Sequence, residues 1–297
     1  MDAQESHQLM NPLLLESESI AHKTSNNSYT LGPMQAGTPC CKPSTLLSIE
    51  NLSLYYGNKP ALENVSLDIY QGCITALIGP SGCGKTSFLS ALNRLTDMIP
   101  DCTVTGNIHY KGIDLHDPTI ELLKLRKEIG MIFQKPVPFP LSIRRNIELP
   151  LQEHGISKQS ELSSIVQQVL LDVGLWEEVK NRLDSSALDL SGGQQQRICI
   201  ARALALKPKV LLMDEPCSAL DPISSAVVED LIKRLQGSYT IVIVTHNLAQ
   251  AKRIANYAGF FWVKETAGCL IEFGQCKQIF ESPTHELTAA YVNGCRG

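Results

Sequence analysis

Short apolar runs bounded by glycine and polar residues recur along the chain and predict strands. Ile74–Ile78, Val210–Met213 and Thr240–Val244 are strand-sized and apolar nearly throughout, as in strands that are covered on both faces. Apolar and polar residues alternate instead in Leu47–Glu50 and Val65–Ile69, which favours strands with one exposed face. The pattern therefore predicts a β-rich protein with both buried and half-exposed strands.

Segments of helical character lie between these strands. Ser87–Leu92 reads as a helix after the first buried strand, and helices at Ser225–Gln236 and Asn247–Asn256 alternate with the later strands. This alternation predicts a mostly parallel sheet joined by helical crossovers. Further elements are predicted as helices at Ile120–Leu125 and Ile165–Leu171 and as strands at Gly106–Tyr110, Phe260–Val263 and Leu270–Phe273.

Composition and charge narrow the class of protein. The chain has 297 residues, of which 43% are hydrophobic and 19% charged, and it can form one large or two medium domains. Its net charge of -4 argues against nucleic acid as the main partner. Ten cysteines without a C-x-x-C pair are expected to be reduced and mostly buried thiols, not a zinc site.

The start of the chain differs from the rest. Residues 1–45 are rich in Ser, Asn, Gln and Thr and predict a flexible extension ahead of a folded domain over residues 46–297. The first residues are polar, so no secretory signal is expected. Since no apolar run approaches the roughly 18 to 20 residues of a membrane helix, we expect the chain to stay in the cytosol.

A complete phosphate-loop pattern follows the strand at Ile74–Ile78. The pattern G-x-x-x-x-G-K-[ST] is met by Gly79, Pro80, Ser81, Gly82, Cys83, Gly84, Lys85 and Thr86. The glycines let the backbone turn its amides inward, Lys85 would reach the β- and γ-phosphates of ATP, and the Thr86 hydroxyl would bind Mg²⁺. A glycine-rich surface turn is the alternative interpretation, which the flanking strand and helix disfavour.

A second anion-binding pattern, Leu-Ser-Gly-Gly-Gln, occupies residues 190–194. The Ser191 hydroxyl and the backbone amides of the two glycines, of which Gly193 is the second, would open a helix and cradle an anion. Because the phosphate loop already supplies one cradle, we expect the second one to face a phosphate bound by another chain. The pattern therefore predicts a protein that closes on ATP from two sides.

Two carboxylates follow the apolar strand Val210–Met213. Ligands collect at the carboxyl ends of strands in such sheets, so Asp214 is expected to hold Mg²⁺ and Glu215 to polarise the attacking water. This assignment fits phosphoryl transfer, in which positioning and charge stabilisation dominate. Solvated charges in a loop are the alternative for this pair.

Four further residues have a functional and a structural interpretation each. His246 follows an apolar strand and suits a γ-phosphate contact, or is an ordinary structural histidine. Gln134 also ends a strand, and its amide can contact Mg²⁺ and water or simply lie at the surface. Asp221 either acts across an interface or caps the next helix. Tyr56 either stacks on adenine or is a buried strand residue.

Together these residues resemble the ATP-binding cassette (ABC) family from about Leu46 to the C-terminus. The resemblance implies an α/β fold, a P-loop NTPase (RecA-like) core with an antiparallel β subdomain and a helical signature subdomain at about residues 119–190. Two cassettes pair head to tail in this family, which implies a homodimer. By this resemblance Ser191 and Gly193 serve the partner's γ-phosphate, and each chain's own site consists of Lys85, Thr86, Gln134, Asp214, Glu215 and His246.

Four segments resemble more narrowly the ATP-binding subunits of bacterial phosphate importers: Phe133–Pro140, Gln194–Gln196, Ser218–Ser224 and Tyr239–Asn247. That resemblance implies ATP hydrolysis coupled to uptake of inorganic phosphate through two transmembrane permease subunits, fed by a periplasmic phosphate-binding protein. The chain would then sit peripherally on the cytoplasmic face of the inner membrane. The chain departs from the usual pattern at Cys217, where cassettes commonly carry Thr. It also departs at Asp189, in the segment Ile147–Gln152 and in its longer N-terminus.

Other functions remain open at this point. A cassette for another solute is the first alternative, because a nucleotide-binding chain does not contact the transported solute. A soluble cassette acting on DNA or ribosomes is disfavoured, since the short segment between Lys85 and Ser191 lacks sustained heptads and the chain has one phosphate loop. A regulatory binder without turnover would be expected to lack Glu215. The proline-spaced residues after Gln134 are either a stiff exposed loop or a surface for the permease subunits.

Overall fold

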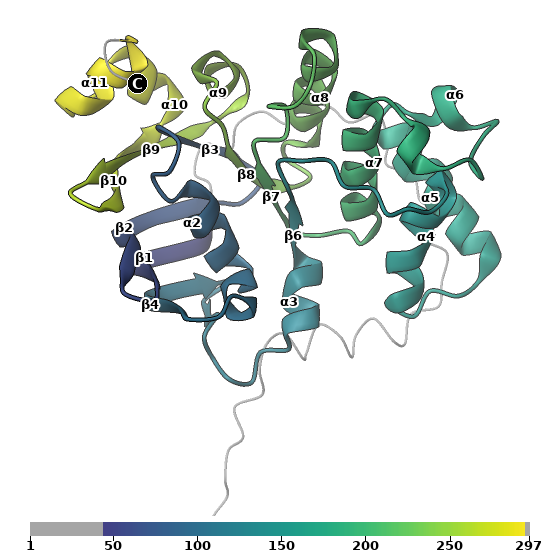
Figure 1. Ribbon diagram of the computed structural model, residues 1–297, viewed down its shortest axis with the longest axis horizontal. Coiled ribbons are helices and arrows are strands. Elements are labelled where there is room, and N and C mark those ends of the chain that lie inside the picture. Colours follow the sequence, from purple (N-terminus) through teal and green to yellow (C-terminus); the bar gives the residue numbers. More distant parts are fainter. Residues whose placement is uncertain (1–43, 295–297) are drawn as a thin grey trace, which may run out of the picture. The chain divides into compact units, whose positions relative to one another are not determined.

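A ten-stranded sheet runs through residues 44–294, the part of the chain that the computed structural model describes (Figure 1). In chain order the strands are β1 (Thr45–Tyr56), β2 (Lys59–Tyr70), β3 (Ile74–Ile78), β4 (Cys102–Tyr110), β5 (Ile113–Asp114), β6 (Ile129–Ile132), β7 (Val210–Asp214), β8 (Thr240–Val244), β9 (Tyr257–Lys264) and β10 (Ala267–Gln275). They lie in the order β5-β4-β1-β2-β10-β9-β3-β8-β7-β6. The predicted extension over residues 1–45 lies almost entirely outside the described residues.

β1, β2 and β4 pair antiparallel, and their burial alternates along the chain. A tight turn joins β1 to β2, where Tyr56 pairs with Lys59. Gly57 has a φ of 57° in this turn, a conformation that glycine adopts at little cost. The strands predicted at Leu47–Glu50 and Val65–Ile69 are confirmed, and both extend further than the alternation indicated.

β3, β7 and β8 form the parallel centre of the sheet and are buried along their whole length. β3 lies between β8 and β9, and β7 lies between β8 and β6. Five of the nine neighbouring strand pairs are parallel. The predicted parallel pairing is confirmed for β3, β7 and β8. The sheet as a whole is mixed, because antiparallel neighbours such as β1–β2 and β9–β10 follow each other directly in the chain. The carboxyl ends of β3, β7 and β8 share one edge.

The helices are α2 (Lys85–Leu92), α3 (Leu122–Glu128), α4 (Ile143–Glu153), α5 (Gln159–Asp172), α6 (Trp176–Val179), α7 (Gly192–Ala205), α8 (Pro222–Leu235), α9 (Leu248–Ile254), α10 (Cys276–Glu281) and α11 (Glu286–Val292), with 3₁₀ turns at Leu95–Met98 and Ala187–Asp189. α4, α5 and α6 gather beside α7 (Figure 1), and α7 also contacts β6 and α8. Within the described residues, no helix has the length and apolar character needed to cross a membrane.

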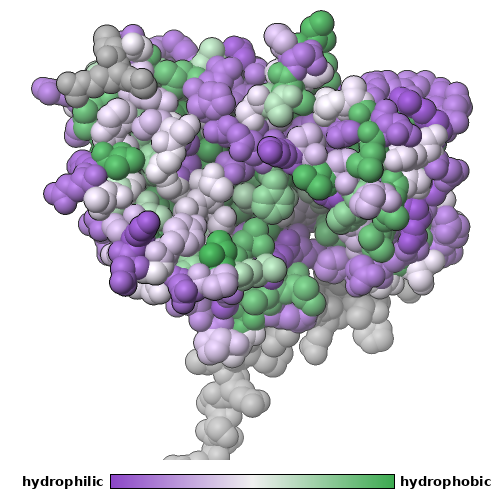
Figure 2. All heavy atoms as spheres, viewed as in Figure 1, coloured by the Kyte–Doolittle hydropathy of each residue, from purple (hydrophilic) through white to green (hydrophobic). Residues whose placement is uncertain are grey.

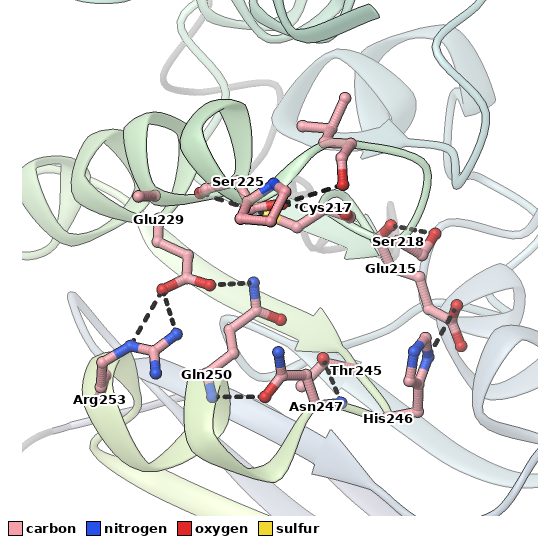
Figure 3. A pocket seen from close by; sticks show the side chains of 13 residues that line it. Glu215, Cys217, Ser218, Ser225, Glu229, Thr245, His246, Asn247, Gln250 and Arg253 are labelled. Carbon is pink, nitrogen blue, oxygen red and sulfur yellow. Dashed lines mark hydrogen bonds and ion pairs between the residues drawn. The ribbon is translucent and has the colours of Figure 1, made fainter.

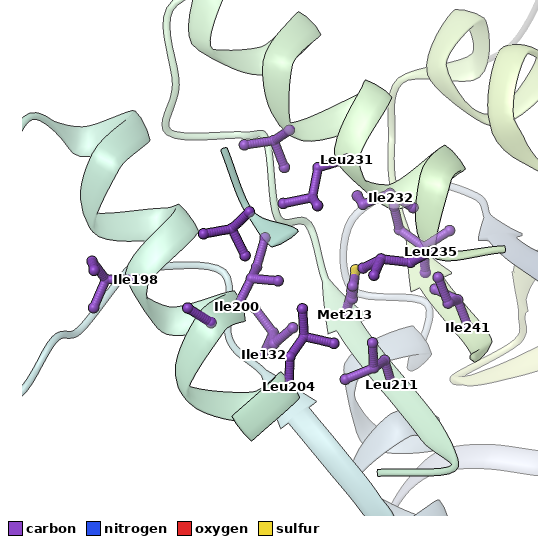
Figure 4. Close-up of a cluster of buried hydrophobic side chains, with 14 of the residues drawn as sticks. Ile132, Ile198, Ile200, Leu204, Leu211, Met213, Leu231, Ile232, Leu235 and Ile241 are labelled. Carbon is purple, nitrogen blue, oxygen red and sulfur yellow. The ribbon is translucent and has the colours of Figure 1, made fainter. Parts of the chain in front are cut away.

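A hydrophobic cluster joins α7 to the centre of the sheet and to α8 (Figure 4). Ile200 and Leu204 of α7 face Met213 of β7, and Leu231 and Leu235 of α8 cover the same strand, all of them buried. Truncating such a buried leucine to alanine typically costs about 2–5 kcal/mol. This packing fixes the helix that begins at the Leu-Ser-Gly-Gly-Gln pattern to the strand that ends in Asp214.

Candidate functional site

A cavity of about 900 Å³ opens beside the phosphate loop, at the carboxyl edge of the parallel strands. We call it the phosphate-loop cavity. It is lined by Tyr56, Pro60, Ala61, Gly79, Pro80, Ser81, Gly82, Gly84, Lys85, Thr86, Ser87, Gln134, Glu215, Val244, His246 and Tyr291. The fold thus brings together residues that the sequence predicted from β1, the phosphate loop and the ends of β6, β7 and β8. Cys83 does not line the cavity, because its side chain is buried.

The phosphate loop needs glycine at two positions for reasons visible in the structure. A Cβ on Gly79 would collide with the backbone carbonyl oxygen of Phe261, and one on Gly84 would lie 2.5 Å from the Leu62 side chain. Gly84 also has a φ of 85°, and it precedes α2 without a side-chain cap. The first amides of α2 are therefore not occupied by a capping side chain and can bind an anion.

Lys85 is buried against the loop to which it belongs. Its ammonium group donates hydrogen bonds to the carbonyl oxygens of Gly79 at 2.8 Å and Pro80 at 2.7 Å, and its Nζ lies 3.3 Å from Cys83 Sγ. Burial raises the pKa of the Cys83 thiol, although the Lys85 charge opposes this. Cys83 is therefore a neutral thiol that packs under the lysine. A phosphate in the loop would offer the ammonium group a charged acceptor in place of two carbonyls.

Thr86 and Asp214 form a pair of oxygen ligands. The Thr86 hydroxyl lies 2.9 Å and 3.1 Å from the two carboxylate oxygens of Asp214, to which it donates. Burial raises the pKa of Asp214, and the neighbouring Glu215 charge adds to this, whereas the Thr86 hydrogen bond and Lys85 lower it. A buried carboxylate beside a hydroxyl, facing a phosphate site, fits Mg²⁺, which takes oxygen ligands from carboxylates and substrate phosphates.

Gln134 and His246 both contact one carboxylate oxygen of Glu215, and Figure 3 shows the contact with His246. Oε2 of Glu215 accepts a hydrogen bond from Gln134 Nε2 at 2.8 Å, and His246 Nδ1 lies 3.2 Å from the same atom. Glu215 has a φ of 43°, a conformation that residues with a Cβ adopt rarely and mostly where the surroundings enforce it. Here its amide is held by the carbonyl oxygen of Val244, the last residue of β8, at 3.0 Å. The other carboxylate oxygen, Oε1, accepts no hydrogen bond from these two side chains.

Two tyrosines close the phosphate-loop cavity. Tyr56 lines it from the end of β1, and its hydroxyl is 3.0 Å from Ser87 Oγ. Tyr291 lines it from α11 and was not predicted from the sequence. Its ring stacks on Phe260 of β9, with the two ring centroids 4.9 Å apart. Burial raises the pKa of Tyr291.

Ser191, Gly193 and Asp221 do not line the phosphate-loop cavity of their own chain. Ser191 caps α7 in a capping box with Gln194, in which its Oγ accepts from the Gln194 amide. A Cβ on Gly193 would lie 2.6 Å from Ser224 Oγ, so this glycine permits close packing of α7 on α8. Asp221 caps α8 by accepting from the amides of Ile223 and Ser224, each at 3.0 Å. The capping interpretation of Asp221 is confirmed, and its role across an interface stays a prediction.

Comparison with known proteins shows the family of the chain and several similar relatives. A family model described as ABC transporter matches residues 62–218. The chain belongs to the ABC transporter family. It is 65% identical over 269 residues to "Phosphate import ATP-binding protein PstB 1" of Nitrosococcus oceani, which covers 91% of this chain and 97% of that relative. "Phosphate import ATP-binding protein PstB" of Thermotoga maritima is 49% identical, with 84% of this chain and 98% of the relative covered.

A solved member of the ABC transporter family has the same fold. The structure of cbiO1 from Clostridium perfringens, described as part of the ABC transporter complex cbiONQ, matches with a TM-score of 0.68 and 26% identity, covering 85% of this chain and 95% of that one. The predicted fold, a P-loop NTPase core carrying an antiparallel β part and a helical part, is thereby confirmed. The matched residues 62–218 include the phosphate loop, Gln134, the Leu-Ser-Gly-Gly-Gln pattern and Glu215, but not Tyr56, His246 or Tyr291.

Proposed function

We propose that this chain is the ATP-hydrolysing subunit of an importer of inorganic phosphate. The observation that carries the proposal is its high identity, over nearly their whole length, to ABC transporter subunits named for phosphate import. The geometry supports the ATPase part, since a phosphate loop, a buried carboxylate and a hydrogen-bonded glutamate line one cavity. An ABC importer of another solute is the alternative, because no residue of this cavity would contact the transported solute.

The phosphates of ATP are expected to lie on the amides of the loop and of the first turn of α2. Lys85 would exchange the carbonyl oxygens of Gly79 and Pro80 for the β- and γ-phosphates. Thr86, Asp214 and Gln134 would hold Mg²⁺, and bound Mg²⁺ neutralises charge on the phosphates during transfer. Tyr56, at the rim of the cavity, would stack on the adenine ring.

Glu215 would orient the attacking water and accept its proton. Gln134 and His246 both hold Oε2, which leaves Oε1 for the water. An imidazole ring has two nitrogens on opposite edges. His246 contacts Glu215 through Nδ1, so Nε2 is the nitrogen that would face a γ-phosphate oxygen. In this arrangement the three residues position the water and stabilise the charge that develops on the phosphate.

A second copy of the chain is expected to complete the site. The capping box uses Ser191 Oγ as an acceptor, so its O–H group is still available to donate to a phosphate oxygen. The amides of Gly192 and Gly193 are the first two of α7 and have no intrahelical partner. Since neither Ser191 nor Gly193 reaches the cavity of its own chain, they would serve the partner's γ-phosphate in a head-to-tail homodimer, with Asp221 at the same interface.

A groove between α3, β6 and α7 supports contact with the two permease subunits. Its lining includes exposed apolar residues after β6, among them Phe133 (56% exposed) and Val137 (63% exposed). This loop is held in place, because the Arg202 guanidinium lies 4.2 Å from the Phe139 ring and donates to the Val137 carbonyl at 3.2 Å. Hydrophobic side chains flank a hollow between α3 and the helices α4–α7 (Figure 2). A held apolar surface suits a protein partner.

The groove would face the permease subunits in the proposed assembly. The chain would dock on the permease subunits at the cytoplasmic face of the inner membrane and act with a periplasmic phosphate-binding protein only through them. The domain boundaries belong to this proposal, namely an extension over residues 1–45 and an ATP-binding domain over residues 46–297 with a helical part at about 119–190. Strand β6 lies within residues 119–190 but pairs with β7 of the central sheet. Among the helices, α4 and α5 contact each other and α7, and α6 contacts α5.

Phosphate uptake tests the function directly. Cells that lack the chain should take up little phosphate at low external concentration, the wild-type chain should restore uptake, and Lys85→Ala should not, because the lysine is expected to hold the phosphates of ATP. Unchanged phosphate uptake in cells without the chain would contradict the assignment to phosphate and favour another solute. ATP hydrolysis by the purified chain, measured separately, tests the ATPase part.

A further inference from the structure

A second cavity, of about 370 Å³, adjoins the phosphate-loop cavity. Glu215 and His246 line both cavities and so form the wall between them. The rest of the second cavity is formed by the loop after β7, by α8 as far as Glu229, by the residues that follow β8, and by α9 as far as Arg253 (Figure 3). We call it the α8–α9 cavity. Its shape depends on how α8 and α9 are held relative to each other.

The loop after Glu215 is tied to α8 on one side of this cavity. Ser218 donates to the Glu215 carbonyl oxygen through its amide at 3.1 Å and its hydroxyl at 3.0 Å. The Ser225 hydroxyl of α8 donates to the Cys217 carbonyl oxygen at 3.4 Å, and the Cys217 thiol lies 3.9 Å from the Ser225 carbonyl oxygen. Any shift of α8 is therefore transmitted to the residues that follow Glu215.

His246 is tied to α9 on the opposite side. α9 begins at Leu248, and Asn247 caps it by accepting from the Gln250 amide at 3.0 Å. The Asn247 amide in turn donates to the Thr245 hydroxyl at 3.0 Å. The backbone on both sides of His246 is thus fixed by the start of α9. The position of this helix sets where the imidazole ring meets Glu215.

Glu229 of α8 joins the two helices at the base of the cavity (Figure 3). Its Oε1 accepts from Gln250 Nε2 at 3.2 Å, and its Oε2 accepts from Arg253 Nε at 3.1 Å and Nη2 at 2.6 Å. Glu229 and Gln250 are 8% and 2% exposed. Buried polar groups are costly to leave without a partner, so this geometry strongly favours one relative placement of α8 and α9.

We propose that Glu229 is a positioning residue for ATP hydrolysis, which holds α9 against α8 and thereby sets the Glu215–His246 contact. The inference rests on the proposed ATPase function. A purely structural ion pair is the alternative, and buried ion pairs often add little net stability. The two differ in what they affect, since a positioning role acts on turnover through His246, whereas a structural role acts on the amount of folded protein.

Glu229→Gln in the full-length chain tests the proposal, because it removes the charge and keeps the size. We expect kcat for ATP to fall about tenfold, since small misplacements in an active site cost up to about 10²-fold. KM should stay within about twofold of the wild type, because the phosphate loop does not contact Glu229. Asp230→Asn is the matched control, an exposed acid next along the same helix, and it should leave both constants unchanged.

Restoring the contact in reverse should rescue turnover. The double variant Glu229→Gln with Gln250→Glu places the carboxylate on α9 and the amide on α8, so the helices can again be joined and Arg253 keeps an acid within reach. We expect kcat to return to within about threefold of the wild type. Arg253→Gln, at a side chain that is 55% exposed, weakens the same contact without burying a new group and should lower kcat in the same direction.

The outcomes separate the inference from the function on which it rests. A wild-type chain without ATP turnover contradicts the proposed function and the inference with it. Active wild type together with an unchanged kcat in Glu229→Gln contradicts the inference alone. A fall in thermal stability that fully accounts for the lost activity, with no rescue in the double variant, means that the ion pair is structural and also overturns the inference. Should Glu229→Gln fold poorly, Arg253→Gln decides by the same two constants.

Discussion

Replacing Glu215 with glutamine should separate ATP binding from ATP turnover. The amide has the same shape as the carboxylate, so its oxygen can still accept from Gln134 Nε2 and His246 Nδ1, which now lie 2.8 Å and 3.2 Å from Oε2. The hydrogen bonds lose their charged acceptor, which makes each roughly half as strong. The arrangement of the phosphate-loop cavity should therefore persist, and only the acceptor for the water proton is removed.

The size of the effect follows from that single loss. A positioned general base contributes about 10²–10⁴-fold to a rate, equivalent to about 3–5 kcal/mol of barrier. We expect kcat of Glu215→Gln to fall by this factor, while the dissociation constant for ATP stays within about twofold. Because ATP would no longer be consumed, the closed homodimer should accumulate and elute with twice the monomer mass in the presence of Mg-ATP.

Three measurements on one preparation check this reasoning. Steady-state ATP hydrolysis gives kcat, equilibrium binding gives the ATP affinity, and size-exclusion chromatography with light scattering gives the mass with and without Mg-ATP. Glu281→Gln, an exposed acid on α10, carries the same charge change and should behave as the wild type. Turnover in Glu215→Gln within about tenfold of the wild type would remove Glu215 from the role of base. A monomer in Mg-ATP would contradict the proposed pairing of chains.

Ser191→Ala should lower ATP hydrolysis about tenfold or more with little change in the ATP affinity of the monomer. Because this change also removes the cap of α7, the control is Ser142→Ala, which removes the corresponding cap of α4. Equal losses of binding and turnover would mean that Ser191 does not act on the partner's ATP. Asp214→Asn should raise the thermal stability in EDTA at neutral pH, because burial raises the Asp214 pKa and so disfavours its charged form. The folded wild type binds the Asp214 proton more readily than the unfolded chain does. The difference in thermal stability between variant and wild type should therefore shrink as the pH falls toward the folded-state pKa. A less stable Asp214→Asn under these conditions contradicts this argument.

The sequence identified the elements and the local chemistry because both depend on neighbours in the chain. The apolar run Ile74–Ile78 is strand β3, and Gly79 and Gly84 of the phosphate loop lie where a Cβ would collide with other atoms. The Ser191 and Asp221 caps are equally local, since each side chain accepts from amides two or three residues on. Such features are set by backbone sterics and hydrogen bonds within one turn.

The sheet order and the residues across the cavity were decided by the tertiary structure alone. β3, β7 and β8 are buried along their whole length, so their side chains do not specify which strand lies beside which, and the order of the sheet could not be predicted from their pattern. No residue near Tyr291 in the chain indicates that its side chain lines the phosphate-loop cavity.

For the reacting groups, sequence determined their chemical types and the fold determined their distances. The residue types and their places at strand ends singled out Gln134, Glu215 and His246, but a carboxylate oxygen within 2.8 Å of Gln134 and 3.2 Å of His246 exists only once β6, β7 and β8 lie side by side. The Glu229 contacts between α8 and α9 depend likewise on packing between distant segments. The physical reason is the same in each case, since long-range contacts follow from burying apolar faces together, and a periodic pattern states that a face is buried without stating against what.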